Sequence, residues 1–140
     1  MGENRPVAPD LRNAEQMRTL CAAFDEGRLI AMPTETVYGL AAPIDRPDLV
    51  ERIFELKGRP PSNPLIVHVA SVEQAKTCVL SWPALAESLA EAFWPGPLTL
   101  VLPRSQAVSD RITAGQDTVA LRMPDHPVAL ALIEALGLPV

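Results

Sequence analysis

Hydrophobic residues follow two different spacings along the chain, and these predict alternating helices and strands. Met17, Leu20, Cys21 and Phe24 recur at helical spacing, and Gly27 ends that pattern. Short apolar runs bounded by turn residues predict strands instead. The predicted helices cover residues 13–27, 45–57, 71–80, 83–93 and 125–137, and the predicted strands cover residues 29–32, 64–69, 98–102 and 118–123. This alternation is typical of an α/β fold, with a mixed sheet flanked by helices.

The stretch 33–40 (PTETVYGL) gathers more polar groups than a core segment carries. Thr34, Thr36 and Tyr38 supply hydroxyls and Glu35 supplies a carboxylate, directly after the apolar strand at 29–32. Open α/β sheets place their ligand sites at the C-terminal ends of strands, so we expect a ligand at this edge. Glu35 is a candidate for binding magnesium or an amine, although no second carboxylate lies beside it in sequence.

Composition limits the classes of function. With 140 residues, 48% of them hydrophobic, the chain can form one domain with a sizeable core, predicted at 13–140 behind a flexible lead-in at 1–12. A net charge of −5 argues against a strongly basic nucleic-acid surface. Two isolated cysteines and the lack of metal-ligand motifs predict no zinc site, disulfide framework or other metal site, and both cysteines are expected to be buried. No apolar run is long enough to span a bilayer, and we expect a cytoplasmic protein.

Two cations, Lys57 and Arg59, lie at a predicted helix C-terminus and in the loop that follows. Cations in a last helical turn often only complement the helix dipole. The proline-rich segment 60–64 (PPSNP) stiffens the loop, however, and so fixes where Arg59 points. A lysine point charge beside an arginine fork is also a plausible clamp for a polyphosphate.

Arg122 is the sharper anomaly. Strand alternation places it with Thr118 and Ala120, opposite the apolar face formed by Val119 and Leu121. An arginine in such a strand needs an anionic partner, which could be an internal acid or a substrate carboxylate or phosphate.

His68 ends an apolar strand and faces away from its apolar neighbours. It is either a hydrogen-bonded core residue or part of a site.

Five spaced motifs make the chain resemble the Sua5/YrdC/YciO family. They are 33–40 (PTETVYGL), 57–60 (KGRP), 63–68 (NPLIVH), 93–99 (FWPGPLT) and 118–124 (TVALRMP). The resemblance implies a twisted α/β sheet, the YrdC-like fold. It also implies a nucleotidyltransferase, an L-threonylcarbamoyladenylate synthase. Such an enzyme makes threonylcarbamoyl-AMP from L-threonine, bicarbonate and ATP for the t6A modification next to the anticodon of tRNA.

The resemblance also implies roles for single residues. Lys57 and Arg59 would act in catalysis on the phosphates or bicarbonate, and Asn63 would join them in binding the nucleotide. The proposed threonine site comprises Thr34, Thr36, Tyr38, His68 and Arg122, with Arg122 taking the carboxylate. ATP would be a substrate, accompanied by Mg²⁺, and no tightly bound cofactor is implied. The expected partners are tRNA or double-stranded RNA and the downstream proteins that complete t6A.

One departure from the family pattern concerns residues 138–140. They look like the first residues of a further strand, and in the family such a run continues into a Ser-x-Asn motif that completes the nucleotide clamp. We therefore expect the chain to lack the C-terminal part of the family domain, to bind ATP weakly and to catalyse poorly. An alternative is an RNA-binding or translation-associated module without catalysis. Another is a relative that performs a different carbamoyl-adenylate chemistry, as in hydrogenase maturation proteins.

Overall fold

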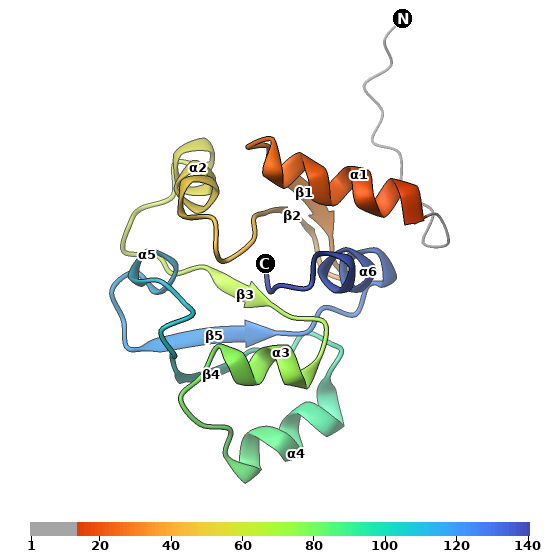
Figure 1. Ribbon diagram of the computed structural model, residues 1–140. Coiled ribbons are helices and arrows are strands. Elements are labelled where there is room, and N and C mark those ends of the chain that lie inside the picture. The colour runs from red at the N-terminus through yellow and green to blue at the C-terminus, as the bar shows by residue number, and fades with distance from the viewer. Residues whose placement is uncertain (1–13) are drawn as a thin grey trace, which may run out of the picture.

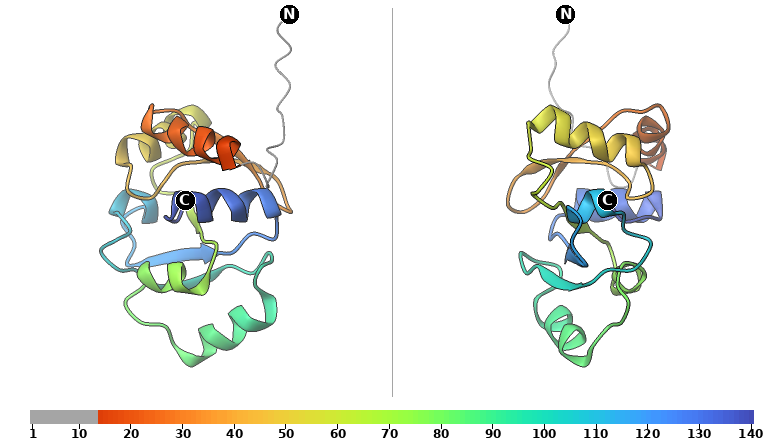
Figure 2. Two further views of the ribbon diagram at one scale, coloured as in Figure 1. Left: turned by 45° about the vertical axis from the view of Figure 1, so that its right-hand side comes forward. Right: turned by 90° about the vertical axis from the view of Figure 1, so that its left-hand side faces the viewer.

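The computed structural model describes residues 14–140, so the predicted lead-in at 1–12 and Asn13 lie outside the described part. Figure 1 shows α1, α2 and the β1–β2 hairpin in the upper half, and β3, β5, β4, α3 and α4 in the lower half. In both views of Figure 2, α6 lies between the two halves. The elements in chain order are α1 (Ala14–Asp25), β1 (Ile30–Pro33), β2 (Tyr38–Ala41), α2 (Pro47–Lys57), β3 (Ile66–His68), α3 (Val72–Thr77), α4 (Ala84–Phe93), β4 (Leu100–Pro103), α5 (Asp110–Thr113), β5 (Thr118–Arg122) and α6 (Pro127–Leu136).

The strands form two separate sheets. Strand β5 lies in the middle of a three-stranded sheet, parallel to β3 and antiparallel to β4, which confirms the predicted mixed sheet. Strands β1 and β2 form an antiparallel hairpin of their own, with Pro33 opposite Tyr38. The polar stretch is therefore the turn and second strand of a hairpin, and β2 is a strand that the hydrophobic pattern did not predict.

Side chains along the central strand β5 alternate between the core and the opposite face of the sheet, as the sequence pattern predicts. Val119 and Leu121 are 1% and 0% exposed, and Leu121 is the registered neighbour of Val67 on β3 and Leu100 on β4. All of these residues belong to one hydrophobic core. On the opposite face, Arg122 lies beside His68 in the parallel register. Sheet pairing thus brings two predicted site residues together.

Several predicted helix ends shift. Ser71, the first residue of the predicted range 71–80, is the N-cap of α3: its Oγ accepts a hydrogen bond from the Gln74 N–H at 3.1 Å, and the helix ends at Thr77. The helix predicted from residue 125 begins later than expected: His126, not Asp125, is the N-cap of α6, and its Nδ1 accepts from the Val128 N–H at 3.1 Å. The helix predicted from residue 45 begins at Pro47, because proline suits a first helical position.

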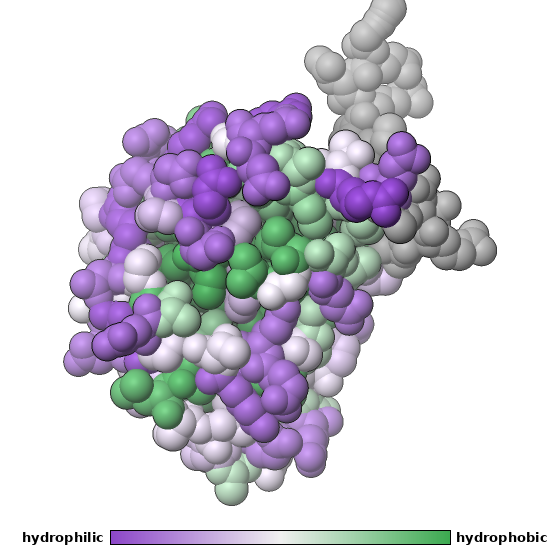
Figure 3. Space-filling view, in the orientation of Figure 1, coloured by the Kyte–Doolittle hydropathy of each residue, from purple (hydrophilic) through white to green (hydrophobic). Residues whose placement is uncertain are grey.

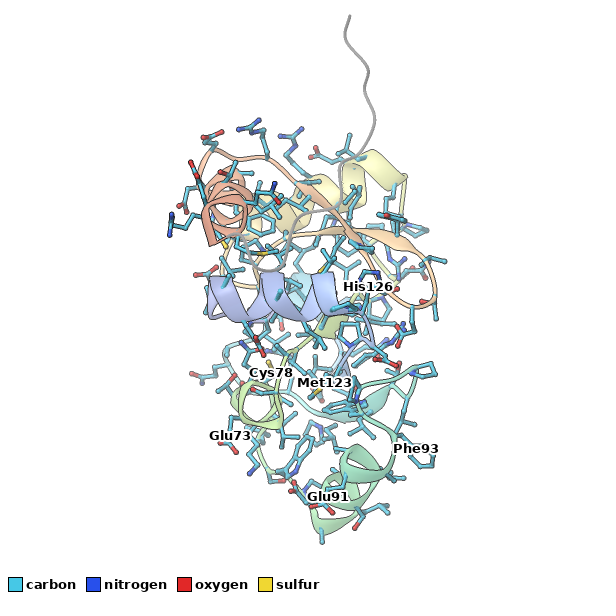
Figure 4. The ribbon with its side chains drawn as sticks, turned by 90° about the vertical axis from the view of Figure 1, so that its right-hand side faces the viewer. Glu73, Cys78, Glu91, Phe93, Met123 and His126 are labelled. Atoms are coloured by element: carbon cyan, nitrogen blue, oxygen red, sulfur yellow. The ribbon has the colours of Figure 1, made fainter. Side chains whose placement is uncertain are left out.

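The cysteine prediction holds fully at one position. Cys78, labelled in Figure 4, is completely buried beside the end of α3, whereas Cys21 is only partly buried. Phe93, in the same view, lies at the outer side of α4 and is 56% exposed.

An arginine joins α2 to α5, a short helix in a segment expected to be a loop. Arg111 donates from Nε and Nη2 to the two carboxylate oxygens of Glu51, at 2.6 and 2.8 Å. Its guanidinium also lies 3.9 Å from the ring centroid of Phe54. Bidentate pairing and a cation–π contact fix relative orientation better than a single ion pair does. They hold the C-terminal half of α2, and hence Lys57, beside the mixed sheet.

Residues 138–140 run alongside β3. The Val140 backbone exchanges two hydrogen bonds with His68, N–H to carbonyl at 3.0 Å and carbonyl to N–H at 2.7 Å. The Ile44 N–H also donates to the Pro139 carbonyl at 3.1 Å. Reciprocal bonding between two residues is characteristic of antiparallel pairing.

The core face of β5 gives a stability prediction. Leu121→Ala should lower the free energy of unfolding by about 2–5 kcal/mol, since it leaves a cavity in the middle of the mixed sheet. Leu80→Ala is a matched control, because Leu80 is 73% exposed, and should change it by less than about 0.5 kcal/mol. Urea unfolding measures both, and equal effects would contradict this description of the core.

Candidate functional site

The hairpin turn is organised by the hydroxyl of Thr34. Its Oγ1 donates to the Val37 carbonyl at 2.7 Å and accepts from the backbone N–H groups of Val37 and Thr36 at 3.1 and 3.3 Å. The Thr36 hydroxyl lies 3.0 Å away and is the donor in that contact, because the Thr34 proton is already engaged. The Thr34 side chain therefore stabilises the turn with hydrogen-bonding capacity that a ligand would otherwise use.

Arg122 has an internal acid as its partner. It is 9% exposed, and its Nη2 donates to Glu35 Oε1 in a close ion pair across 87 residues of sequence. Its Nε donates to the Gly96 carbonyl at 3.3 Å, and its Nη1 makes only a long 3.4 Å contact with Thr36 Oγ1. Of the two partners that the sequence left open, the internal acid is present, and Nη1 keeps donor capacity for a ligand.

In the described part of the chain, Lys57 and Arg59 have no such acid as a partner. Gly58 adopts φ 59° as the helix C-cap, a left-handed conformation that glycine accepts without a Cβ clash, and turns the chain between the two cations. Arg59 donates from Nε to the Asn63 carbonyl at 3.2 Å and from Nη2 to the Pro64 carbonyl at 2.6 Å. Within residues 14–140 neither cation forms an ion pair, and Arg59 Nη1 makes no hydrogen bond. The loop fixes the arginine while leaving its charge uncompensated.

A backbone carbonyl determines the tautomer of the neutral His68 ring. Its Nδ1 lies 3.2 Å from the Ile66 carbonyl, which can only accept, so Nδ1 carries the proton and Nε2 is left as an acceptor. Burial lowers the pKa of His68 below its ordinary value of 6.5. The hydrogen bond to Ile66 and the charge of Glu35 oppose this shift, and the charge of Arg122 adds to it.

A cavity of about 270 Å³ connects these groups. Its polar lining comes from the hairpin turn, the end of α2 and the paired ends of β3 and β5, and consists of Thr34, Thr36, Lys57, Arg59, His68 and Arg122. The remaining lining is largely apolar and includes Ile44, Val50, Ile53, Leu65, Ile112 and Val140. Figure 3 shows apolar residues gathered between α2, α5 and β3 and ringed by hydrophilic ones. The arrangement places two cationic ends on one apolar cavity.

Two predicted site residues do not line the cavity. Tyr38 is 69% exposed at the start of β2, and the Asn63 side chain is exposed, although the Asn63 carbonyl holds Arg59. Glu35 is the contact that sequence reasoning missed. The unexplained cation at Arg122 and the unexplained acid in the polar stretch were both visible, but nothing in sequence spacing paired them.

A family model matches residues 22–140, that of Sua5/YciO/YrdC proteins, described as "Telomere recombination". The chain is 54% identical over 125 residues to the threonylcarbamoyl-AMP synthase of Pyrococcus abyssi, covering 89% of this chain and 37% of that protein. It is 50% identical to the Bacillus subtilis threonylcarbamoyl-AMP synthase, covering 91% and 37%. The chain therefore belongs to the Sua5/YciO/YrdC family, as the motifs indicate.

Solved structures agree with this fold. The crystal structure of P. abyssi Sua5 complexed with L-threonine superposes with a TM-score of 0.86 at 53% identity, over 91% of this chain and 37% of that one. E. coli YciO gives a TM-score of 0.82 at 26% identity, over 94% and 64%. The YrdC-like fold is thus confirmed. The chain spans little more than a third of the length of the Pyrococcus and Bacillus synthases.

The lowered pKa of His68 predicts a pH-dependent stability. Because the unfolded chain takes up this proton at a higher pH than the folded chain, the free energy of unfolding should fall as pH drops below 6.5 toward the folded-state pKa. His68→Asn lacks this dependence, so the stability difference between wild type and variant should shrink with acidification in denaturant titrations from about pH 8 to about pH 5. A difference that is constant with pH would contradict the assignment.

Proposed function

We propose that this chain supplies the substrate cavity of an L-threonylcarbamoyladenylate synthase. The reaction joins L-threonine, bicarbonate and ATP into threonylcarbamoyl-AMP and releases pyrophosphate. The observation that carries the proposal is one cavity with two unlike ends: Arg122 with the Thr36 hydroxyl at one, and the uncompensated cations Lys57 and Arg59 at the other. The names of the Pyrococcus and Bacillus relatives and the threonine complex of P. abyssi Sua5 support it.

The first end suits the amino acid. Arg122 Nη1 would donate to the threonine carboxylate, with the Thr36 hydroxyl beside it. Threonine must lose a proton from its ammonium group before its nitrogen can attack, and neutral His68 offers Nε2 as the acceptor. The amine then attacks the carbon of bicarbonate, and loss of water leaves a carbamate.

The second end suits the phosphates. A carbamate oxygen would attack the α-phosphorus of ATP, forming the mixed anhydride while the bond to the leaving pyrophosphate breaks. Lys57 and Arg59 would stabilise negative charge on the triphosphate and on the departing pyrophosphate, Arg59 through its open Nη1. Positioning both reactants in one cavity supplies much of such a rate enhancement.

Magnesium would enter with ATP as part of the substrate. Among residues 14–140, no three His, Cys, Asp or Glu side chains are grouped to hold a metal ion. Both carboxylate oxygens of Glu35 are engaged, one by Arg122 and the other by the Asp125 N–H at 2.7 Å, so this acid is not a free metal ligand.

Among residues 14–140, no helix has the length and apolar character needed to cross a membrane. The product would pass to proteins that transfer the threonylcarbamoyl group to tRNA.

The test is pyrophosphate release from Mg-ATP with and without L-threonine and bicarbonate. Lys57→Ala should lower threonine-dependent release about a hundredfold, because it removes a charge that faces the phosphates. Lys76→Ala is the matched control: Lys76 pairs with Glu73 at 3.6 Å on α3 and does not line the cavity, so activity should be unchanged. Threonine-independent release, or equal activity of the two variants, would overturn the proposal.

A further inference from the structure

The two cationic ends of the cavity differ in charge compensation. Arg122 is paired with Glu35, so the charges at its end nearly cancel. Lys57 and Arg59 form no ion pair within residues 14–140, and Arg59 is bound only by neutral carbonyls. Yet both arginines present the same kind of donor, an Nη1 with hydrogen-bonding capacity left over. What separates them electrostatically is the carboxylate of Glu35.

Glu35 is fixed behind Arg122 rather than in the cavity. It does not line the cavity, whereas both Arg122 and Thr36 do. Its side chain is 23% exposed, and its second oxygen accepts the Asp125 N–H at 2.7 Å. Displacing the carboxylate would therefore leave a buried guanidinium without its counter-charge and a backbone N–H without its acceptor. The Arg122–Glu35 pair is therefore a constant part of the site.

We propose that Glu35 is a specificity-determining positioning residue that makes the Arg122 end selective for the carboxylate of a zwitterion and excludes phosphate from it. This inference rests on the proposed function and assigns the charge partition within the same cavity. A phosphate dianion at Arg122 gains attraction from the guanidinium but meets repulsion from Glu35 close behind it. A zwitterionic amino acid has no net charge, so it meets little net repulsion from Glu35, and its carboxylate keeps the hydrogen bond from Arg122 Nη1. Phosphates are thereby directed to Lys57 and Arg59.

The test isolates the Arg122 end and uses inorganic phosphate as the probe. In a Lys57→Ala/Arg59→Ala background, calorimetry should detect no phosphate binding while Glu35 is intact. Adding Glu35→Gln should create measurable phosphate binding, because removal of a nearby like charge strengthens the anion contact. Its affinity should be at least about tenfold above the weakest affinity that the background titration could have detected. Adding Arg122→Gln as well should abolish the gain. Glutamine keeps an oxygen that can accept the Asp125 N–H, and thermal unfolding checks that each variant is folded.

Two controls separate local charge from net charge and from loss of structure. Glu73→Gln removes the same charge from α3, on the opposite side of the view in Figure 4 from His126 and the hairpin, and should not create binding. Glu35→Asp keeps the charge and should leave phosphate excluded. Equal gains with Glu35→Gln and Glu73→Gln, or no gain with a folded Glu35→Gln, would overturn the inference. So would Arg122-dependent phosphate binding with Glu35 intact, a measurement that needs no Glu35 variant.

L-threonine titrations distinguish this inference from the proposed function. Wild type should bind threonine, and in Glu35→Gln phosphate should become a competitor of threonine, a change that simple loosening of the turn would not produce. If wild type binds no threonine, the proposed function fails while the phosphate experiment still decides the charge partition. If wild type binds threonine and phosphate never competes in the folded variant, only the role of Glu35 fails.

Discussion

A buried guanidinium without an anion is among the most costly groups a domain can hold, and this constraint organises the structure around Arg122. Strand β5 carries Arg122 on the face opposite the core, and the anion comes from Glu35 in the β1–β2 turn. The ion pair therefore connects two sheets that share no backbone ladder. The cavity lies where the hairpin meets the mixed sheet, so the contact that satisfies the arginine also helps to set the cavity's shape.

The turn shows how similar side chains take different tasks. Thr34 uses its hydroxyl on the turn backbone, whereas Thr36 reaches Arg122 across the cavity edge. A turn that must hold Glu35 in one place needs internal hydrogen bonds, and Thr34 supplies them at the cost of its own availability to a ligand. Such support is what keeps site residues in a productive geometry, and it explains why a hydroxyl-rich stretch is not simply a row of ligand contacts.

The sequence predicted the parts of the fold that periodicity determines. Alternation along β5 placed Arg122 opposite Leu121, and helical spacing found α2 with Lys57 in its last turn, because burial imposes those periods. The hydrophobic pattern did not predict strand β2, because Tyr38 is exposed and the segment is too polar to be recognised as a buried strand. Which hairpin residues face the cavity depends on pairing between distant segments, so spacing could not exclude Tyr38 or pair Glu35 with Arg122.

The two cavity arginines are held in similar ways but differ in charge compensation. Both are fixed by hydrogen bonds from Nε and Nη2, so each loses little further side-chain freedom when Nη1 meets a ligand. Carbonyl oxygens hold Arg59 without cancelling its charge, whereas a carboxylate holds Arg122 and does cancel it. Both guanidinium groups are therefore preorganised, but the electrostatic potential at the Arg59 end is more positive than at the Arg122 end. In the proposed reaction, this difference in the supporting group would direct the phosphates to the Lys57 and Arg59 end and the amino acid to the Arg122 end of a single cavity.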